Sequence, residues 1–255
     1  MKAHLRKVLL LAGLLTLAGA ATASAIGSCI GPLCVSVTAT LQPRELPKHG
    51  NAPVSLSSVV RINSHDGSTP PTLQTLEFLF DKHGTVDTRG LPVCTLAKLE
   101  GTTPAEGRKR CADALVGRGS SKVLVSMPGK APFTFTSPVS FFNGAPSGGN
   151  PTLIAQGYET VPAPKTLLVP IVIERISHGR YGFRARIEMP EIAGGYGAPL
   201  LAEATIGRTR MRGGKKVGYI NAHCVGGRLQ VYGTMRATNG DFFPATLTSP
   251  CHTPG

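Results

Sequence analysis

Tryptophan is absent from the 255-residue chain, and aromatic side chains make up only 5% of it. Proteins that hold sugars usually stack the sugar ring on a Trp or Tyr face, because such a face offers a large apolar surface. With no Trp and five Tyr, the sequence disfavours a carbohydrate module of this kind. Acidic residues are also scarce: 14 Asp and Glu stand against 27 Lys and Arg, a formal net charge of +13.

The motifs that mark common enzymes and cofactor sites are missing as well. The chain has no Gly-x-Ser-x-Gly elbow, P-loop, dinucleotide-binding fingerprint or EF-hand loop. No Cys-x-x-Cys pair occurs, and His223-Cys224 has no second ligand at zinc-finger spacing. We therefore predict no catalytic residues, no metal and no cofactor from motifs alone.

The chain begins with an export signal. Residues 1–25 combine a basic leader, an almost wholly apolar stretch over 8–20 and small residues before the expected cut after Ala25. The apolar stretch is shorter than the roughly 20 residues that span a bilayer. We predict a protein of residues 26–255 that is secreted, either into the extracellular space or into the cell envelope. A retained membrane anchor and a lipoprotein lipidated at Cys29 are the alternatives.

The cysteine count fits an oxidising compartment. All six cysteines lie in the exported part, and an even number in a secreted chain is most simply explained by three disulfides. Clustering along the chain favours the pairs Cys29–Cys34, Cys94–Cys111 and Cys224–Cys251. Lipidation of Cys29 would leave Cys34 single, so the first pair depends on how the N-terminus is processed.

Composition and periodicity predict a β-rich fold. The chain has 31 Gly and 21 Pro, and only 16% of its residues are charged, which suits a sandwich or barrel with many turns. Apolar and polar residues alternate over 35–41, 76–80 and 133–141. We predict an all-β antiparallel β-sandwich that forms a single domain over 26–255. The Gly- and Pro-rich stretch 143–151 marks either a boundary between two packed β lobes or a long surface loop.

Two hairpins are specified locally. Residues 171–176 are expected to pair with 181–189, because both segments alternate on either side of a short polar turn. Residues 229–237 are expected to pair with 243–247 across Asn239-Gly240. The Asn-Gly dipeptide readily takes the positive φ angles of a type I′ turn, so we predict that turn here.

One short helix is expected within an insert at residues 95–117. Thr103-Pro104-Ala105-Glu106 offers an N-cap hydroxyl, Pro at the first helical position and Glu at the third, which is a capping box. The helix would cover 104–116 and end at Gly117. A Cys94–Cys111 bond would tether it to the preceding strand. An irregular disulfide loop is the alternative.

Four short motifs occur in the later part of the chain. They are Leu-Pro-Val-Cys at 91–94, Cys111 with Ala-Leu-Val-Gly-Arg-Gly at 114–119, Phe-Asn-Gly at 142–144 and Tyr-Ile-Asn-Ala-His-Cys at 219–224. In these motifs the chain resembles a family of secreted actinobacterial proteins that has no assigned activity. The resemblance covers most of the chain from about residue 75 onward. It implies an exported scaffold with the two later cysteine pairs, and it brings no functional residues.

Only a basic pattern points to a binding function. The candidate polyanion-binding residues are Arg184, Arg186, Arg208, Arg210, Arg212, Lys215 and Lys216. The arginines of 208–212 alternate along a predicted strand and should emerge on one face, and Gly213-Gly214 can turn the chain back to the lysines. A row of cations suits polyanions, because each neutralised phosphate releases condensed counterions. Charges that protect a strand edge are the alternative.

The sequence therefore predicts an exported, non-catalytic protein that contacts anionic cell-wall polymers or lipid head groups, with no specific nucleic-acid partner. Two other classes stay open, and each makes a structural prediction. A hydrolase with dispersed catalytic residues would place Glu188, Glu191 or His223 in a cleft. A carrier of apolar ligands would enclose a cavity, and the lining residues that we expect for it are Phe78, Phe133 and Phe183.

Overall fold

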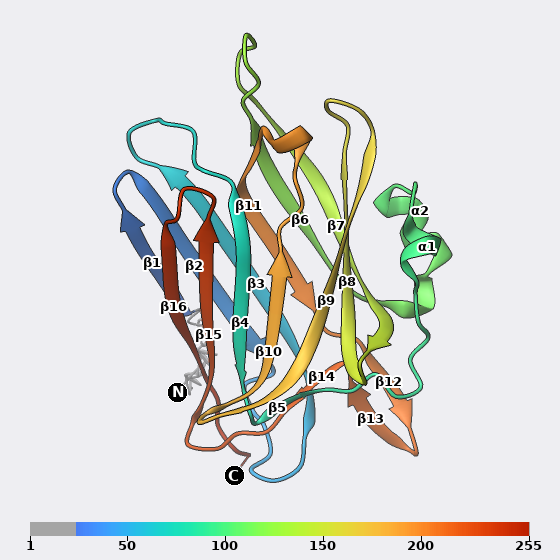
Figure 1. The fold of residues 1–255 in the computed structure, drawn as a ribbon. Coiled ribbons are helices and arrows are strands. Elements are labelled where there is room, and N and C mark those ends of the chain that lie inside the picture. The colour runs from blue at the N-terminus through green and yellow to red at the C-terminus, as the bar shows by residue number, and fades with distance from the viewer. Residues whose placement is uncertain (1–23, 255) are drawn as a thin grey trace, which may run out of the picture.

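The computed structural model describes residues 24–254, so nearly all of the predicted signal peptide lies outside the described residues. The described part consists mainly of antiparallel strands (Figure 1). The strands are β1 (Ser24–Ile30), β2 (Leu33–Gln42), β3 (Ala52–Ser64), β4 (Leu73–Asp81), β5 (Gly84–Val86), β6 (Leu115–Val125), β7 (Phe133–Ser147), β8 (Asn150–Glu159), β9 (Lys165–His178), β10 (Tyr181–Glu188), β11 (Gly197–Ile206), β12 (Thr209–Arg212), β13 (Lys215–Gly218), β14 (Ile220–Ala222), β15 (Arg228–Ala237) and β16 (Phe242–Pro250). The predicted all-β antiparallel class is confirmed.

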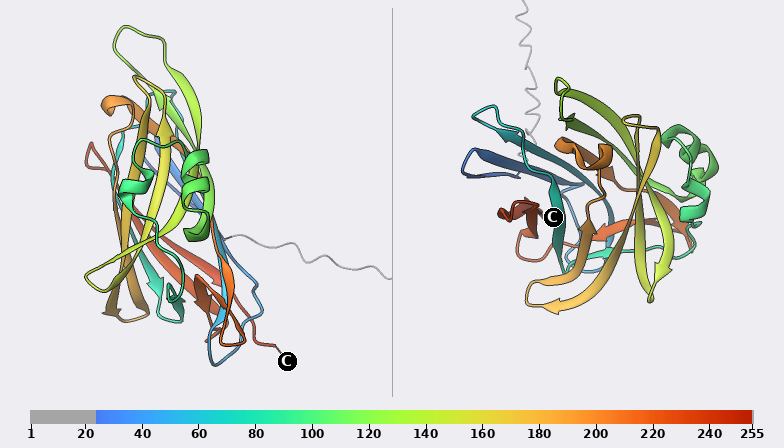
Figure 2. Two further views of the ribbon diagram at one scale, coloured as in Figure 1. Left: turned by 90° about the vertical axis from the view of Figure 1, so that its right-hand side faces the viewer. Right: turned by 45° about the horizontal axis from the view of Figure 1, so that its top comes forward.

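One large sheet organises the molecule. Its main path follows the order β1-β2-β3-β11-β6-β7-β8-β9-β10-β4-β15-β16, and β5 and β14 join it through β3. The sheet curls until β1 and β2 pack against β16, which makes it barrel-like and nearly closed (Figures 1 and 2). The two layers expected of a sandwich are thus opposite walls of one sheet. The β12–β13 hairpin forms a separate two-stranded sheet.

Alternating side chains fill the space inside the curled sheet in two main clusters. One cluster contains Val35, Ile62 and Phe243 and joins β2, β3 and β16. The other contains Phe141 and Ile173 and lies between strands of the β6–β10 part of the sheet. Because successive side chains of a strand point to opposite faces, the period of two in the sequence places these residues inside.

The predicted helical insert forms, but its helix is shorter than expected. α1 (Leu96–Leu99), α2 (Pro104–Arg110) and the 3₁₀ turn η1 (Ala112–Ala114) pack on the outside of the sheet near β7, β8 and β9 (Figure 2). The capping box between Thr103 and Glu106 is confirmed. The helix stops before residue 116, because Leu115 already begins β6. Gly117, the expected end, lies in β6 where the β11 backbone leaves no room for a side chain.

All three predicted disulfides form: Cys29–Cys34, Cys94–Cys111 and Cys224–Cys251. The Sγ atom of Cys29 is bonded to Cys34, and one sulfur cannot also carry a lipid thioether. Across residues 24–254, no helix is long and apolar enough to cross a bilayer.

Both predicted hairpins are confirmed, as β9–β10 and β15–β16. The turn of the second one differs from the expected type I′. Only Gly240 has a positive φ, of 93°, whereas a type I′ turn needs positive φ at both central residues. The loop is longer than two residues, because the Ala237 N–H donates to the Asp241 carbonyl and the Gly240 N–H donates to the Ala237 carbonyl.

Residues 143–151 form a hairpin, which corrects the expectation of a linker or a long loop. β7 continues to Ser147 and β8 begins at Asn150. Gly148 and Gly149 make the turn with φ angles of 56° and 79°, the left-handed values that glycine adopts at no steric cost. The two-residue turn needs positive φ at both Gly148 and Gly149, and these glycines contribute to the linker-like composition of the stretch.

Candidate functional site

The predicted basic hairpin is present at one end of the barrel (Figure 1). β12 and β13 pair from Thr209 opposite Gly218 to Arg212 opposite Lys215. Gly213 and Gly214 turn the chain with φ angles of 55° and 72°, as a type I′ turn requires. The hairpin is therefore specified by its own glycines.

The arginines of this hairpin alternate as predicted, but they are turned toward the protein. Nη1 of Arg208 donates to the carbonyl oxygens of residues 112, 113 and 115 at 2.7–3.2 Å. Nη2 of Arg210 donates to the carbonyls of Asp87 and Arg89 and to the Asp87 carboxylate at 3.0 Å. Arg212 lies 3.1 Å from the same carboxylate. All three side chains fasten the hairpin to neighbouring segments.

Asp87 is the centre of this arrangement. Its side chain is 9% exposed and contacts three guanidinium groups, those of Arg89, Arg210 and Arg212. Burial opposes its ionisation, but hydrogen bonds from Arg89 and the positive charges of Arg89 and Arg212 outweigh burial and lower the pKa of Asp87 to about 2. The carboxylate therefore stays charged at any physiological pH and neutralises part of the arginine row.

Lys215 and Lys216 form the free end of the hairpin. Both are exposed, and among the described residues no carboxylate lies within ion-pair distance of either ammonium group. Arg212 is 39% exposed and can also reach solvent from its place beside Asp87. The hairpin thus exposes Lys215 and Lys216 at its tip, whereas Arg208 and Arg210 at its base bind neighbouring segments of the protein.

Arg184 and Arg186 do not join this surface. Nη2 of Arg184 lies 2.6 Å from Glu174, and Nε of Arg186 lies 2.6 Å from Glu188. Both pairs sit on the outside of β10, which pairs with β4 and β9 and not with β12 or β13. These arginines are already neutralised by partners on the same wall.

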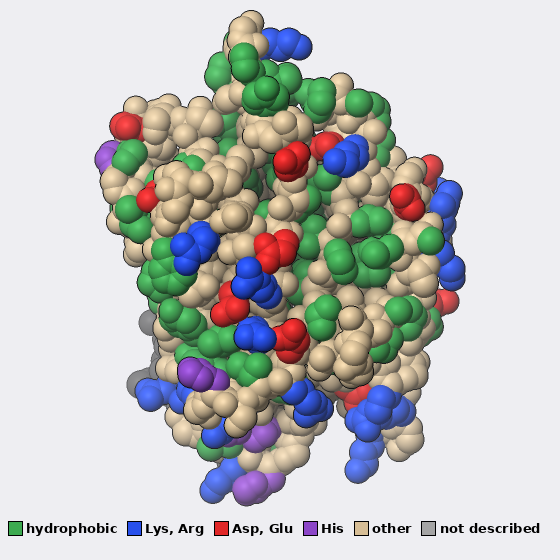
Figure 3. Space-filling view, in the orientation of Figure 1, with side chains coloured by type: hydrophobic (Ala, Val, Ile, Leu, Met, Phe, Trp, Pro, Cys, Tyr) green, Lys and Arg blue, Asp and Glu red, His purple; other side chains and the backbone are tan. Residues whose placement is uncertain are grey.

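Other cations gather at the hairpin's end of the barrel, and we call this surface the basic end. It consists of the exposed residues Lys48, Lys82, Arg89, Arg212, Lys215, Lys216 and Arg228. They come from loops and strand termini that meet there, and Figure 3 shows Lys, Arg and His side chains across the lower end of the molecule. Exposed Glu45 lies at this end, whereas Asp81 and Asp87 are buried and ion-paired.

A histidine cluster lies at the same end, and the sequence singled out only one of its members. Nδ1 of His83 lies 2.7 Å from the buried Asp81 carboxylate, and Nδ1 of His223 lies 2.8 Å from Oδ1 of Asn51. The two rings are in edge contact, with centroids 5.0 Å apart. Burial, together with the charges of His83 and His49, lowers the pKa of His223. His223 therefore becomes positively charged only at a lower pH than an ordinary histidine.

The Asp81 carboxylate also fixes the strands around this cluster. Its second oxygen accepts from Nε of Arg180 at 2.8 Å and from the Gln230 N–H at 3.1 Å. Asp81 thus joins the ends of β4, β15 and the β9–β10 turn. No Ser, Thr or Cys side chain of the described residues is bonded to the ring of His83 or His223, and the pair lacks the nucleophile of a catalytic triad.

The residues expected for a hydrolase do not converge. Glu188 is 65% exposed and paired with Arg186, and Glu191 is exposed in the following loop. Both lie at the end of β10 opposite to the turn near His223. Within residues 24–254, no group of three His, Cys, Asp or Glu side chains is arranged to hold a metal ion.

The residues expected for an apolar carrier do not line one cavity, although Phe78 and Phe183 lie on one face of the β4–β10 pair. Phe183 packs in the core beside Ala185, whereas Phe133 is 36% exposed near the far end of the barrel. The ring of Phe78 contacts that of Phe80 in a tilted arrangement, with ring centroids 6.3 Å apart. Two surface hollows, one near β11 and one near α2, are lined by other residues.

Sequence reasoning missed Asp87 and Asp81, the two carboxylates that organise the basic end. The only local signal was Asp87 two residues before Arg89, a spacing that lets an Asp side chain bond a nearby N–H and guanidinium. The contact with Arg210 spans 123 residues and leaves no local trace. Comparison of the chain with family models, curated proteins and solved structures finds no match.

Proposed function

We propose that this protein is exported, has no catalytic role and binds anionic polymers of the cell envelope through its basic end. The observation that carries the proposal is the gathering of exposed cations on one end of a rigid barrel, with Lys215 and Lys216 unpaired at the tip of an anchored hairpin. Two carboxylates at that end are buried and already engaged. A concentrated cationic surface attracts polyanions through counterion release.

Charge distribution along the barrel supports the same proposal. Exposed acids Asp66 and Glu191 lie in loops at the opposite end. That end also carries exposed Lys130 and Lys165, so the two ends differ in the number of exposed cations, and a long anionic chain would meet the larger positive excess at the end carrying the hairpin. Protection of a sheet edge does not explain all of these cations, because Lys48 and Lys82 lie in turns and not along an exposed strand.

Export rests on the N-terminal pattern of residues 1–25 and on three disulfides, which persist in oxidising compartments. The resemblance of four short sequence motifs to secreted actinobacterial proteins favours the same compartment. We favour polymers over lipid head groups, because few of the large apolar side chains that the described residues expose lie near this end, Met211 and Val225 among them. Membrane-surface binding usually needs a broader apolar face beside its cations.

The test is binding of the oxidised protein to inorganic polyphosphate, polyglutamate and neutral dextran across a salt series. The informative variant is Lys215→Gln/Lys216→Gln, and Lys130→Gln/Lys165→Gln is the matched control because it removes two exposed lysines from the opposite end. We expect the first variant to bind polyphosphate more weakly. The negative slope of log K against log salt should become shallower by about two. The control should keep the wild-type slope.

Equal behaviour of the two variants would refute the proposed site. Binding to dextran as strong as to polyphosphate would refute polyanion recognition. Preference for vesicles that contain anionic lipid over both soluble polyanions would favour head groups as the partner and would contradict the choice of a polymer.

A further inference from the structure

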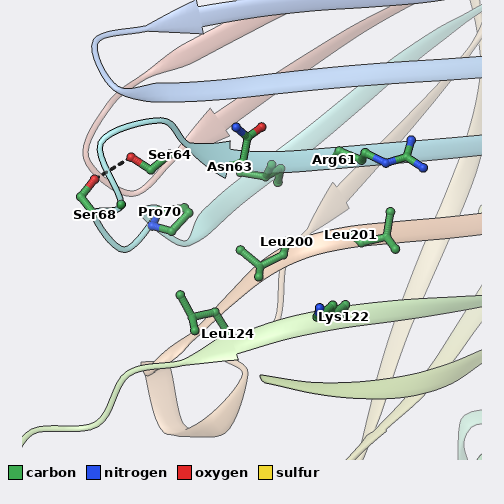
Figure 4. Close-up of a pocket in the computed structure, with 11 residues that line it drawn as sticks. Arg61, Asn63, Ser64, Ser68, Pro70, Lys122, Leu124, Leu200 and Leu201 are labelled. Atoms are coloured by element: carbon green, nitrogen blue, oxygen red, sulfur yellow. Dashed lines mark hydrogen bonds between the residues drawn. The ribbon is translucent and has the colours of Figure 1, made fainter. Parts of the chain in front are cut away.

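The outer face of β3, β11 and β6 carries a groove that lies away from the basic end. It is a shallow depression, open to solvent over much of its extent, with a volume of about 480 Å³. The groove lies beside the β3–β4 loop, which connects the strands at the end opposite to the hairpin (Figure 4). Its lining side chains include Arg61, Pro70, Lys122, Leu124, Leu200 and Leu201.

Two unpaired cations flank the groove. Arg61 on β3 and Lys122 on β6 both stand opposite Leu201 of β11, so the three side chains form a row across the sheet. Both cations are exposed, and among the described residues neither has a carboxylate within ion-pair distance. Glu203, two residues along β11, is held by the Ser120 hydroxyl at 3.0 Å.

Edge protection cannot account for these cations. β3 pairs with β2 and β11, and β6 pairs with β11 and β7, so both strands are interior to the sheet. Cationic guards are needed on strands with unpaired backbone groups, and neither strand is of that kind. β11 lies between β3 and β6, so the backbones of Arg61 and Lys122 are two strand spacings of about 4.8 Å apart, a gap that their long side chains can close on one small anion above Leu201.

The other part of the groove is apolar. A register shift between Pro199 and Leu201 places Leu200 as an extra residue on β11, and both leucines then line the groove. Bulges of this kind re-aim a side chain. Leu124 and Pro70 complete the apolar part, and Figure 4 shows Leu200, Leu124 and Pro70 toward the loop and the two cations toward the other side.

The loop beside the apolar part is held in place. The Ser64 hydroxyl donates to Asp66 at 2.6 Å and lies 2.7 Å from the Ser68 hydroxyl, and the Ser68 N–H donates to the same carboxylate. Thr69 then reaches the Ser126 hydroxyl beyond the end of β6 at 3.3 Å. The loop thus spans from β3 toward β6, so the groove is formed before any ligand arrives.

From this arrangement we infer that the groove binds the carboxylate of a single-chain fatty acid, with its head between Arg61 and Lys122 and its chain along Leu200, Leu124 and Pro70. Charge complementarity selects an anionic head, and the guanidinium of Arg61 suits a planar carboxylate because it donates two parallel hydrogen bonds. The leucines supply an apolar surface for the chain. This site is separate from the basic end, so a test of fatty-acid binding does not depend on the proposed polymer binding.

The test is calorimetric titration of the oxidised protein with dodecanoate, below the concentration at which it forms micelles, and with dodecanol as the uncharged probe. We expect one equivalent of dodecanoate to bind and dodecanol to bind at least tenfold more weakly. Arg61→Gln/Lys122→Gln should lose at least tenfold in affinity. Arg118→Gln is the matched control, because Arg118 is exposed on the same strand and face as Lys122 but lies outside the groove.

The apolar part has its own test. For the wild type we expect the affinity to rise about threefold with each methylene added between octanoate and dodecanoate. Leu124→Ser should weaken dodecanoate binding and reduce this gain in affinity per methylene. Circular dichroism of each variant verifies the fold. Equal affinity for dodecanoate and dodecanol, or wild-type affinity of the double variant, would overturn the inference. Tighter binding of dodecyl phosphate than of dodecanoate would contradict the carboxylate assignment, and Lys215→Gln/Lys216→Gln should leave dodecanoate binding unchanged.

Discussion

Asp87→Asn is the substitution that most directly tests how the basic hairpin is held. The change keeps the shape and one oxygen acceptor of the side chain, but it removes the negative charge that faces Arg89, Arg210 and Arg212. Arg210 is only 13% exposed, so its charge would remain in a poorly solvated place. Removing one member of a buried ion pair usually costs about 3–5 kcal/mol. Because the amide oxygen still accepts a hydrogen bond, we expect a loss of about 3 kcal/mol.

The pH dependence gives an independent magnitude for the same interaction. The pKa of Asp87 falls from an ordinary 3.8 to about 2 on folding, which corresponds to roughly 2 kcal/mol of stability. Since the folded-state pKa is the lower one, this stability is fully present above about pH 5 and is lost as the pH falls toward 2. The Asn variant has no such group, so the gap between it and the wild type should narrow by about 2 kcal/mol over that window.

The assay is urea unfolding followed by circular dichroism at several pH values between 7 and 2, with disulfides intact. Asp113→Asn is the matched control, because Asp113 is exposed and forms no ion pair in the described residues. It should change the unfolding free energy by less than about 0.5 kcal/mol at every pH. A gap between Asp87→Asn and the wild type that stays constant from pH 5 to pH 2 would refute the reasoning.

Three further predictions concern single side chains. Arg208→Met removes the donor to three carbonyl oxygens and should cost about 2 kcal/mol in urea unfolding, whereas a change within error would mean that the hairpin base is held by other contacts. Gly119→Ala would drive a Cβ into the Glu203 backbone, so we expect more than about 3 kcal/mol of destabilisation or failed refolding, and a wild-type midpoint would contradict the close approach of β6 and β11. Because the pKa of His223 is lowered in the fold, its contribution is present above pH 6.5 and is lost as the pH falls; His223→Gln should flatten that decline in thermal melts, and an unchanged slope would place its origin elsewhere.

Local signals predicted the elements that neighbouring residues determine. The capping box at Thr103 and Glu106 fixed the start of α2, and Gly213-Gly214 fixed the turn of the basic hairpin. The cysteine pairs could be predicted because each joins residues that are near in sequence. In each case the interaction that stabilises the element is encoded within a short segment.

Contacts between distant segments could not be predicted in this way. The alternation of Arg210 and Arg212 indicated a common face, but it could not show that Asp87 lies against that face. Gly117 looked like the end of a helix, because nothing in its neighbours reveals that β11 passes beside it. The groove on β11 likewise depends on a register shift at Leu200, and pairing registers are set by three strands together.

The order of strands in the sheet has a consequence for the export that we propose. β11 separates β3 from β6, and β4 pairs with both β10 and β15. Asp81, at the end of β4, accepts hydrogen bonds from Arg180 and Gln230, which follow it by 99 and 149 residues in the sequence. The N-terminal strands therefore have no complete set of partners until most of the chain has been delivered. High contact order slows folding, and a chain that cannot fold early remains threadable through a narrow translocation channel until its last strands emerge.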